Sequence, residues 1–151
     1  MALRKGSLVP NFTAIDSQGE QFDSATVFGK QWVVLFFYPK DDTPGCTTQA
    51  CAFRDRYQDF TDLGAVVIGV SADGVASHLR FQSKYKLPFT LLADTQKKIR
   101  TLFGVPKDLL GLVDGRATYV IGPDQKIHFI FDSLSGSCHM ERALAFLKSK
   151  V

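Results

Sequence analysis

The residues best suited to chemistry lie in one short segment, 39–46 (PKDDTPGC). A continuously apolar stretch, 32–38, precedes this segment, and apolar residues at helical spacing follow it. We therefore expect Cys46 in the first turn of a helix that begins just beyond a buried strand. Free backbone N–H groups and the helix dipole stabilise an anion at such a position, so Cys46 is predicted to react as a thiolate.

The rest of the chain predicts alternating strands and helices that would hold this segment. In chain order the predicted elements are a hairpin of 11–15 and 21–22, a strand at 32–38, a helix over 46–63, a strand at 65–70, a helix over 74–85 capped by Asp73, a strand at 89–92, a helix capped by Asp94 and ending near 103–104, a hairpin of 117–121 and 126–131, and a helix over 139–148. This alternation favours a largely parallel sheet with helices on both faces. Because the hairpins add antiparallel strands, we expect an α/β thioredoxin-like fold with a central mixed sheet and an N-terminal β-hairpin.

Composition narrows the class of protein. The chain has 151 residues, of which 45% are hydrophobic and 22% charged, and this predicts one folded domain over 1–151. A formal net charge of +3 with scattered charges argues against nucleic-acid binding. The basic residues Lys97, Lys98 and Arg100 are interpreted as a solvated helix face. Every apolar run is shorter than the roughly 18 residues of a membrane helix, so no membrane partner is expected.

The remaining cysteines and histidines indicate thiol chemistry without a metal. Three cysteines are too few for a secreted disulfide scaffold, which favours intracellular thiols. His78, His128 and His139 lack metal-ligand spacing, and His78 is expected on a helix surface. We therefore predict neither a metal nor a cofactor.

The spacing of Pro39, Thr43 and Cys46 resembles the peroxiredoxin signature, and the stretch 43–54 resembles the Q-type group, also called bacterioferritin comigratory proteins. The resemblance covers about 6–148 and is nearest to cyanobacterial and plastid members. Further similar stretches are 67–71, 85–92, 103–106 and 115–120.

The resemblance implies an antioxidant thiol peroxidase that reduces hydrogen peroxide and organic hydroperoxides. Cys46 would be the peroxidatic cysteine, and Pro39 would shield it from water. Thr43 would place its hydroxyl on the thiolate and the peroxide, and Arg116 would hold a cation beside the thiolate. Such attack on an O–O bond needs a stabilised thiolate and donors for the leaving oxygen. The alternatives are a turn role for Thr43 and a surface position for Arg116.

Oxidation of Cys46 would give a sulfenic acid, and Cys51 would resolve it as an intramolecular disulfide. An ideal helix places Cα atoms five residues apart at about 8.6 Å, whereas a disulfide tolerates at most about 7 Å. The first turns of the helix are therefore expected to unwind. The alternative is that Cys51 only packs on the helix as an apolar residue. Cys138 is expected to be a bystander, with a redox role as the alternative.

The expected partners are hydroperoxides and thioredoxin or a similar dithiol reductant, and the chain is expected to be a monomer. The segment 1–6 lacks the apolar stretch of a signal peptide, so the predicted location is a bacterial cytoplasm, with a plastid as the alternative. Two other functions remain open. A redox-sensing interaction module could use the same disulfide to change shape. A thioredoxin-like disulfide reductase is less favoured, because its Cys-x-x-Cys motif differs from the spacing of Cys46 and Cys51.

Overall fold

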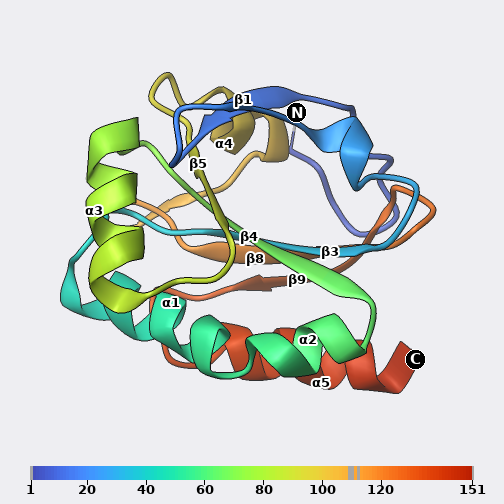
Figure 1. Ribbon diagram of the computed structural model, residues 1–151. Helices are drawn as coiled ribbons and strands as arrows, with labels where there is room; N and C mark the ends of the chain where they lie inside the picture. Colours follow the sequence, from blue (N-terminus) through green and yellow to red (C-terminus); the bar gives the residue numbers. More distant parts are fainter. Residues whose placement is uncertain (1, 109–110, 112, 151) are drawn as a thin grey trace.

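A computed structural model describes residues 2–108, 111 and 113–150 (Figure 1). The strands are β1 (Thr13–Asp16), β2 (Gln21–Asp23), β3 (Trp32–Phe37), β4 (Ala65–Ser71), β5 (Thr90–Ala93), β6 (Lys107–Asp108), β7 (Val113–Asp114), β8 (Ala117–Ile121) and β9 (Ile127–Asp132). The helices are the 3-10 helix η1 (Ser24–Thr26), α1 (Pro44–Asp55), α2 (Tyr57–Asp62), α3 (Val75–Tyr85), α4 (Lys98–Phe103) and α5 (His139–Lys150). Within the described residues no helix has the length and apolarity needed to cross a membrane.

Seven strands form one mixed sheet in the order β2-β1-β5-β4-β3-β8-β9, which confirms the predicted fold class. Among the strands of the described residues, only β3–β4 and β4–β5 pair in parallel. The N-terminal hairpin joins the sheet through antiparallel pairing of β1 with β5, and β8 and β9 extend the other edge in antiparallel pairing. The sheet is therefore less parallel than the alternation of elements suggested, because hairpins occupy both of its edges.

The central strand β3 is buried on both faces, as its apolar sequence predicted. Val34, Phe36 and the following Tyr38 pack into the core beneath α1, α2 and α5, which lie together on one side of the sheet in Figure 1. Val33, Leu35 and Phe37 belong to the opposite core, which includes α4 and the N-terminal segment. The strand therefore reaches the segment 39–46 as a rigid, largely buried element.

The helix predicted over 46–63 begins earlier and is interrupted. Pro44 occupies its first turn, where the fixed φ of proline and its missing N–H fit the helix start. Arg56 leaves helical geometry at φ −113° and ψ 16°, which separates α1 from α2. Phe53 and Phe60 are nevertheless both buried, so the predicted apolar stripe is kept across the break.

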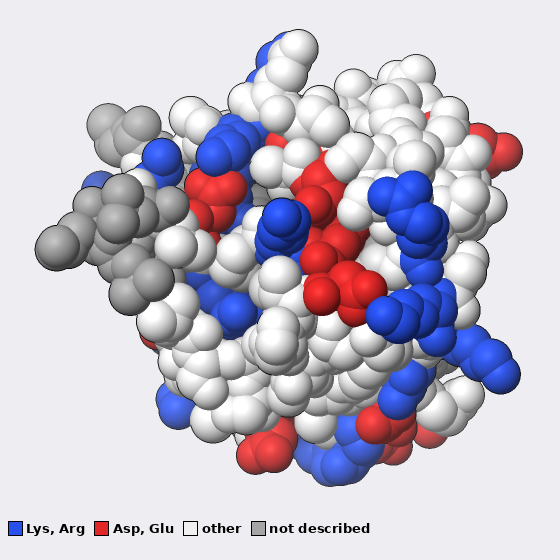
Figure 2. Space-filling model, turned by 90° about the vertical axis from the view of Figure 1, so that its left-hand side faces the viewer, with Lys and Arg blue, Asp and Glu red and all other residues white. Residues whose placement is uncertain are grey.

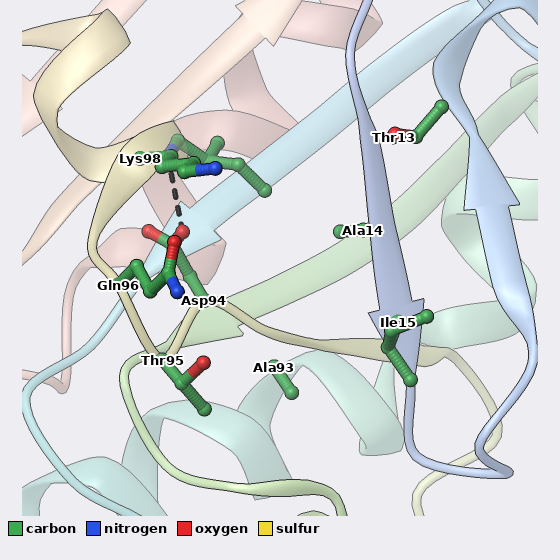
Figure 3. Close-up of a pocket in the computed structure, with 9 residues that line it drawn as sticks. Thr13, Ala14, Ile15, Ala93, Asp94, Thr95, Gln96 and Lys98 are labelled. Carbon is green, nitrogen blue, oxygen red and sulfur yellow. Dashed lines mark hydrogen bonds between the residues drawn. The ribbon is translucent and has the colours of Figure 1, made fainter.

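Two predictions about charged residues were wrong. Arg100 is only 5% exposed, because its guanidinium donates to two main-chain carbonyls rather than to water. Asp73 does not cap α3, whose N-cap is Gly74 without a side-chain bond. Asp94 is not the N-cap of α4, which is Lys97, but its carboxylate accepts from the backbone N–H groups of Ile99 (3.0 Å) and Arg100 (2.9 Å) in the first turn of that helix. Figure 3 shows Asp94 beside a small pocket between β1 and the start of α4.

Candidate active site

Cys46 lies in the first turn of α1, after the loop that leaves β3. The helix begins at Pro44, and Thr43 is its N-cap with extended backbone (φ −99°, ψ 154°). Its first bond runs from Thr47 N to Thr43 O (2.8 Å). The Cys46 side chain is 1% exposed. A buried sulfur at the positive end of a helix is placed where a negative charge is stabilised.

Arg116 lies beside this sulfur, just before β8. Its Nη1 is 3.4 Å from Cys46 Sγ and donates to Gln49 Oε1 at 2.6 Å, while its Nε donates to Leu134 O at 2.9 Å. The side chain is buried, so Arg116 does not take the surface position that was the alternative. The bonds to Gln49 and Leu134 hold the guanidinium against the thiol.

Gln49 is a site residue that the sequence did not single out. It is fully buried one helical turn after Cys46, and its Oε1 accepts from Arg116. Among the described residues its Nε2 has no hydrogen-bond partner. The signal that could have identified Gln49 is its spacing of three from Cys46, which places both side chains on the same helix face.

Two glycines allow the chain to approach the site closely. A Cβ at Gly45 would lie 3.0 Å from Arg116 Nη2. A Cβ at Gly136 would lie 2.3 Å from Gly45 O, so the connection from β9 to α5 passes directly over the start of α1.

The connection from β9 to α5 is held by His139, whose Nε2 donates to Ser133 O (2.8 Å). Burial lowers the pKa of His139 to about 4, so the ring is neutral near pH 7.

Thr43 and Pro39 lie in the same loop and are both half-buried. The Thr43 hydroxyl donates to Lys40 O at 2.9 Å, which is the turn contact considered as the alternative. Its contact with thiolate and peroxide stays a prediction, as does the shielding role of Pro39.

The three cysteines are free thiols in different surroundings. Cys46 is buried, Cys51 is half-buried and Cys138 is exposed. Partial burial raises the pKa of the Cys51 thiol. Because Cys46 and Cys51 both belong to α1, the Cα separation of about 8.6 Å expected for a regular helix applies to them.

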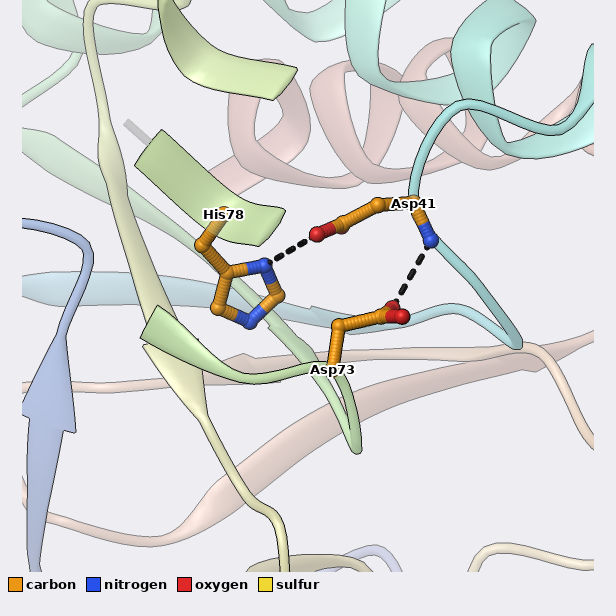
Figure 4. A group of neighbouring side chains, drawn as sticks. All are labelled: Asp41, Asp73 and His78. Atoms are coloured by element: carbon orange, nitrogen blue, oxygen red, sulfur yellow. Dashed lines mark hydrogen bonds and ion pairs between the residues drawn. The ribbon is translucent and has the colours of Figure 1, made fainter. Parts of the chain in front are cut away.

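A buried polar cluster anchors the loop just before Thr43 (Figure 4). The Asp41 carboxylate accepts from Tyr38 OH (2.6 Å) and Ser77 Oγ (2.8 Å) and lies 2.7 Å from His78 Nδ1. Burial, followed by the charge of Asp41, raises the pKa of Tyr38 well above its usual range, so its hydroxyl stays protonated and donates. The backbone N–H of Asp41 donates to Asp73 Oδ2 at 2.8 Å.

His78 is therefore not the surface residue that was predicted. Its ring is fully buried, and its Nε2 donates to Leu92 O at 2.9 Å. Its spacing of three from the buried Phe81 is the signal that indicated an inward face of α3. Asp41, Asp73 and His78 bring three possible metal ligands together, but Asp41, Asp73 Oδ2 and both His78 nitrogens already have protein partners. The cluster is thus a hydrogen-bond network that fixes the loop.

The face of the molecule that carries α3 is strongly charged. Acidic side chains gather at the centre of this view, with lysines and arginines beside them (Figure 2). Asp42 in the catalytic loop accepts from Lys84 Nζ (2.9 Å) and Tyr85 OH (2.8 Å). These bonds lower the pKa of Asp42. They connect the exposed side of the loop to the end of α3.

Comparison with known proteins places these features in a family. Residues 6–130 match the AhpC/TSA family model. The chain is 47% identical over 146 residues to Peroxiredoxin Q, chloroplastic, of Oryza sativa subsp. japonica, covering 96% of this chain and 67% of that relative. It is 47% identical over 148 residues to the protein of the same name from Arabidopsis thaliana, covering 97% and 68%.

Solved structures agree with these relatives. Peroxidoxin BcpB from Mycobacterium tuberculosis superimposes with a TM-score of 0.89 at 35% identity, covering 97% of both chains. A cysteine-to-serine mutant of PrxQ from Xylella fastidiosa gives a TM-score of 0.91 at 29% identity, covering 99% of this chain and 98% of that one. The predicted resemblance to Q-type peroxiredoxins is thereby confirmed.

The predicted bacterial cytoplasm is contradicted by the plant relatives, which are chloroplastic and favour a plastid. The prediction was wrong because its two observations concern secretion and redox state only. Signals of secretion and of thiol redox state do not distinguish one reducing compartment from another.

Proposed function

The chain belongs to the AhpC/TSA family and is a thiol-dependent peroxidase, and from this premise we propose that Cys46 is the thiol that reduces hydrogen peroxide and organic hydroperoxides. The observation that carries the proposal is the 3.4 Å contact between the buried Cys46 Sγ and Arg116 Nη1 at the start of α1. A cation and a helix N-terminus act together there on one sulfur.

The proposed reaction is a displacement on oxygen. The Cys46 thiol first releases its proton to solvent, the thiolate attacks the terminal peroxide oxygen, the new S–O bond forms as the O–O bond breaks, and the hydroxide or alkoxide that leaves takes up one proton from solvent, which replaces the proton that the thiol released. The products are a Cys46 sulfenic acid and water or an alcohol. Arg116 stabilises the thiolate and, with the Thr43 hydroxyl turned toward the substrate, the charge that develops on the leaving oxygen.

Turnover coupled to NADPH through thioredoxin and its reductase tests this assignment. Cys46→Ser is expected to reduce peroxide consumption to the background rate while the circular dichroism spectrum stays that of the wild type. Cys138→Ser is the matched control, because Cys138 is exposed and should leave the rate unchanged. Activity of Cys46→Ser above background would remove Cys46 as the nucleophile.

We further propose that Cys51 resolves the sulfenic acid. Its thiol attacks Cys46 sulfur, the S–S bond forms and water leaves, and a dithiol such as thioredoxin then reduces the disulfide. Unwinding of the start of α1 must precede this step, because about 8.6 Å between Cα atoms exceeds the roughly 7 Å limit of a disulfide.

The fate of the sulfenic acid tests the second step. Cys51→Ser is expected to accumulate Cys46 sulfenic acid that dimedone traps, and to lose turnover with thioredoxin, whereas Cys138→Ser forms the disulfide as the wild type does. Peptide mapping should join Cys46 to Cys51. A disulfide between Cys46 and Cys138, or normal turnover of Cys51→Ser, would contradict the assignment.

A further inference from the structure

Arg100 connects the two segments that bring the reactive groups together. Its Nη2 donates to Tyr38 O at 3.0 Å, and its Nη1 donates to Gly115 O at 2.7 Å. Tyr38 is the residue before Pro39, where the catalytic loop begins, and Gly115 directly precedes Arg116. One guanidinium therefore connects the residue before the loop to the residue before Arg116, whose side chain faces Cys46.

The position of Arg100 is itself well defined. Its backbone N–H donates to Asp94 Oδ2 at 2.9 Å, and its guanidinium carbon lies 5.6 Å from the centre of the Phe37 ring. The planar guanidinium reaches two carbonyls at once, which the single ammonium of a lysine does not do with the same geometry. Arg100 thus acts as a rigid bridge from α4 to the end of β3 and the start of β8.

The surroundings of Arg100 act on its charge in opposite directions. Burial lowers the pKa of Arg100, whereas Asp114 and Asp94, followed by Tyr119 and Cys46, raise it. A buried charge is unfavourable unless it forms strong hydrogen bonds, so an apolar side chain would serve better if packing were the only role. The cation also adds to the positive field at the thiol.

From these contacts we propose that Arg100 is a positioning residue for peroxide reduction, which holds the end of β3 and the segment before β8 at the separation that sets Arg116 against Cys46. The inference rests on the proposed roles of Cys46 and Arg116. Misplacement of a catalytic group by about 1 Å lowers rates by up to about 100-fold, so a bridge of this kind has a direct effect on rate.

Single-turnover oxidation of Cys46 by hydrogen peroxide, followed by stopped flow across pH, tests the inference. Arg100→Met is expected to slow oxidation at least about tenfold and to shift the midpoint of the pH profile upward, because Arg116 moves and a nearby cation is lost. Arg100→Lys keeps the positive charge but cannot form both hydrogen bonds to the Tyr38 and Gly115 carbonyls with the same geometry. Its rate should therefore lie between those of Arg100→Met and the wild type. Ile99→Ala is the control, since Ile99 is buried in the same helix and its apolar side chain has no donor for either carbonyl.

The control separates positioning from stability. Urea unfolding should show that both Arg100→Met and Ile99→Ala are destabilised, but only Arg100→Met should change the rate and pH profile. A wild-type rate and profile for Arg100→Met, or equal slowing by Ile99→Ala, would overturn the inference. If Arg100→Met does not fold, the rate of Arg100→Lys tests the inference instead. A wild-type rate and pH profile for Arg100→Lys would then overturn the positioning role of Arg100.

Arg116→Ala in the same assay distinguishes the inference from the function on which it rests. Slow oxidation of Arg116→Ala with normal oxidation of Arg100→Met would reject only the role of Arg100. Normal oxidation of Arg116→Ala would instead reject the proposed role of Arg116.

Discussion

The catalytic loop is held very differently at its two ends. Asp41 accepts from Tyr38 and Ser77 and contacts His78, and its own backbone N–H is bonded to Asp73. At the other end, Thr43 gives α1 no side-chain cap, and the Cys46 thiol has one polar contact among those found in the described residues, at 3.4 Å. Gln49 Nε2, which lies next to this contact, has no partner among the described residues.

The difference in hydrogen bonding between the Asp41 end and the Cys46 end indicates that one end of the loop provides stability and the other provides reactivity. A buried polar network that is fully bonded rigidifies the chain, whereas a buried donor left without a partner costs about 1–3 kcal/mol. Departures from complete bonding are expected where a protein reacts or moves. The Asp41 end is therefore interpreted as the fixed anchor, and the Cys46 end as the part that binds peroxide and unwinds.

Loss of the anchor should have the largest effect. Asp41→Ala leaves the Tyr38 and Ser77 hydroxyls without their acceptor and His78 Nδ1 without its partner in a buried site, and is expected to lower the free energy of unfolding by about 3–5 kcal/mol. Urea denaturation measures this loss. Asp42→Asn is the control from the same loop, because the Asp42 side chain is 44% exposed, a surface ion pair such as the one with Lys84 adds little to stability, and Asn tolerates the left-handed backbone at this position (φ 57°). Equal losses in the two variants would contradict the anchor.

The reactive end should respond in rate rather than in stability. Arg116→Ala is expected to slow Cys46 oxidation about 100-fold and to shift its pH midpoint upward, because the thiolate loses its nearest cation. Stopped-flow oxidation measures both quantities, and urea denaturation should show a smaller loss of stability than for Asp41→Ala. Arg142→Ala, which removes an exposed arginine packed on Phe131, controls for the change in net charge. Equal rates for Arg116→Ala and Arg142→Ala would remove Arg116 from the chemistry.

The same contrast explains what the sequence could predict. The strand at 32–38 and the helix after it follow from local patterns, because apolar runs and helical spacing report burial directly. The contact between Cys46 and Arg116 joins residues 70 positions apart, and only the resemblance to a family indicated it.

The buried roles of His78 and Arg100 were missed for a physical reason. Charged and polar residues are expected on the surface unless partners are known, and the partners here lie far along the chain. Asp41 is 37 positions from His78, and Tyr38 is 62 positions from Arg100. The spacing of His78 from Phe81 indicated an inward face of α3, but composition and spacing carry no record of the partners, which could be assigned only after the sheet had brought the segments together.

The backbone amides of Asp41 and Thr47, on either side of Thr43, should respond differently to oxidation, and the free-energy changes involved are the smallest of those predicted here. Disulfide formation should break the hydrogen bond from Thr47 N to Thr43 O (2.8 Å) and the neighbouring bonds of α1, each worth about 1 kcal/mol net. The Asp41 amide, bonded to Asp73, should keep its bond, since it belongs to the anchor. Amide hydrogen exchange should therefore show oxidation lowering the protection of 44–55 while 32–38 and Asp41 keep theirs.

The loss of helical hydrogen bonds on oxidation also affects how easily the proposed Cys46–Cys51 disulfide is reduced again. A disulfide that forms only at the expense of helical hydrogen bonds is easier to reduce than a relaxed one, and this suits an enzyme that returns to its thiol form in each cycle. Cys51→Ser is the control, because oxidation without a disulfide should leave the protection of 44–55 near that of the reduced protein. Equal protection of 44–55 in the reduced and oxidised wild type would contradict unwinding, and would direct the search for a resolving thiol to Cys138 or to a second chain.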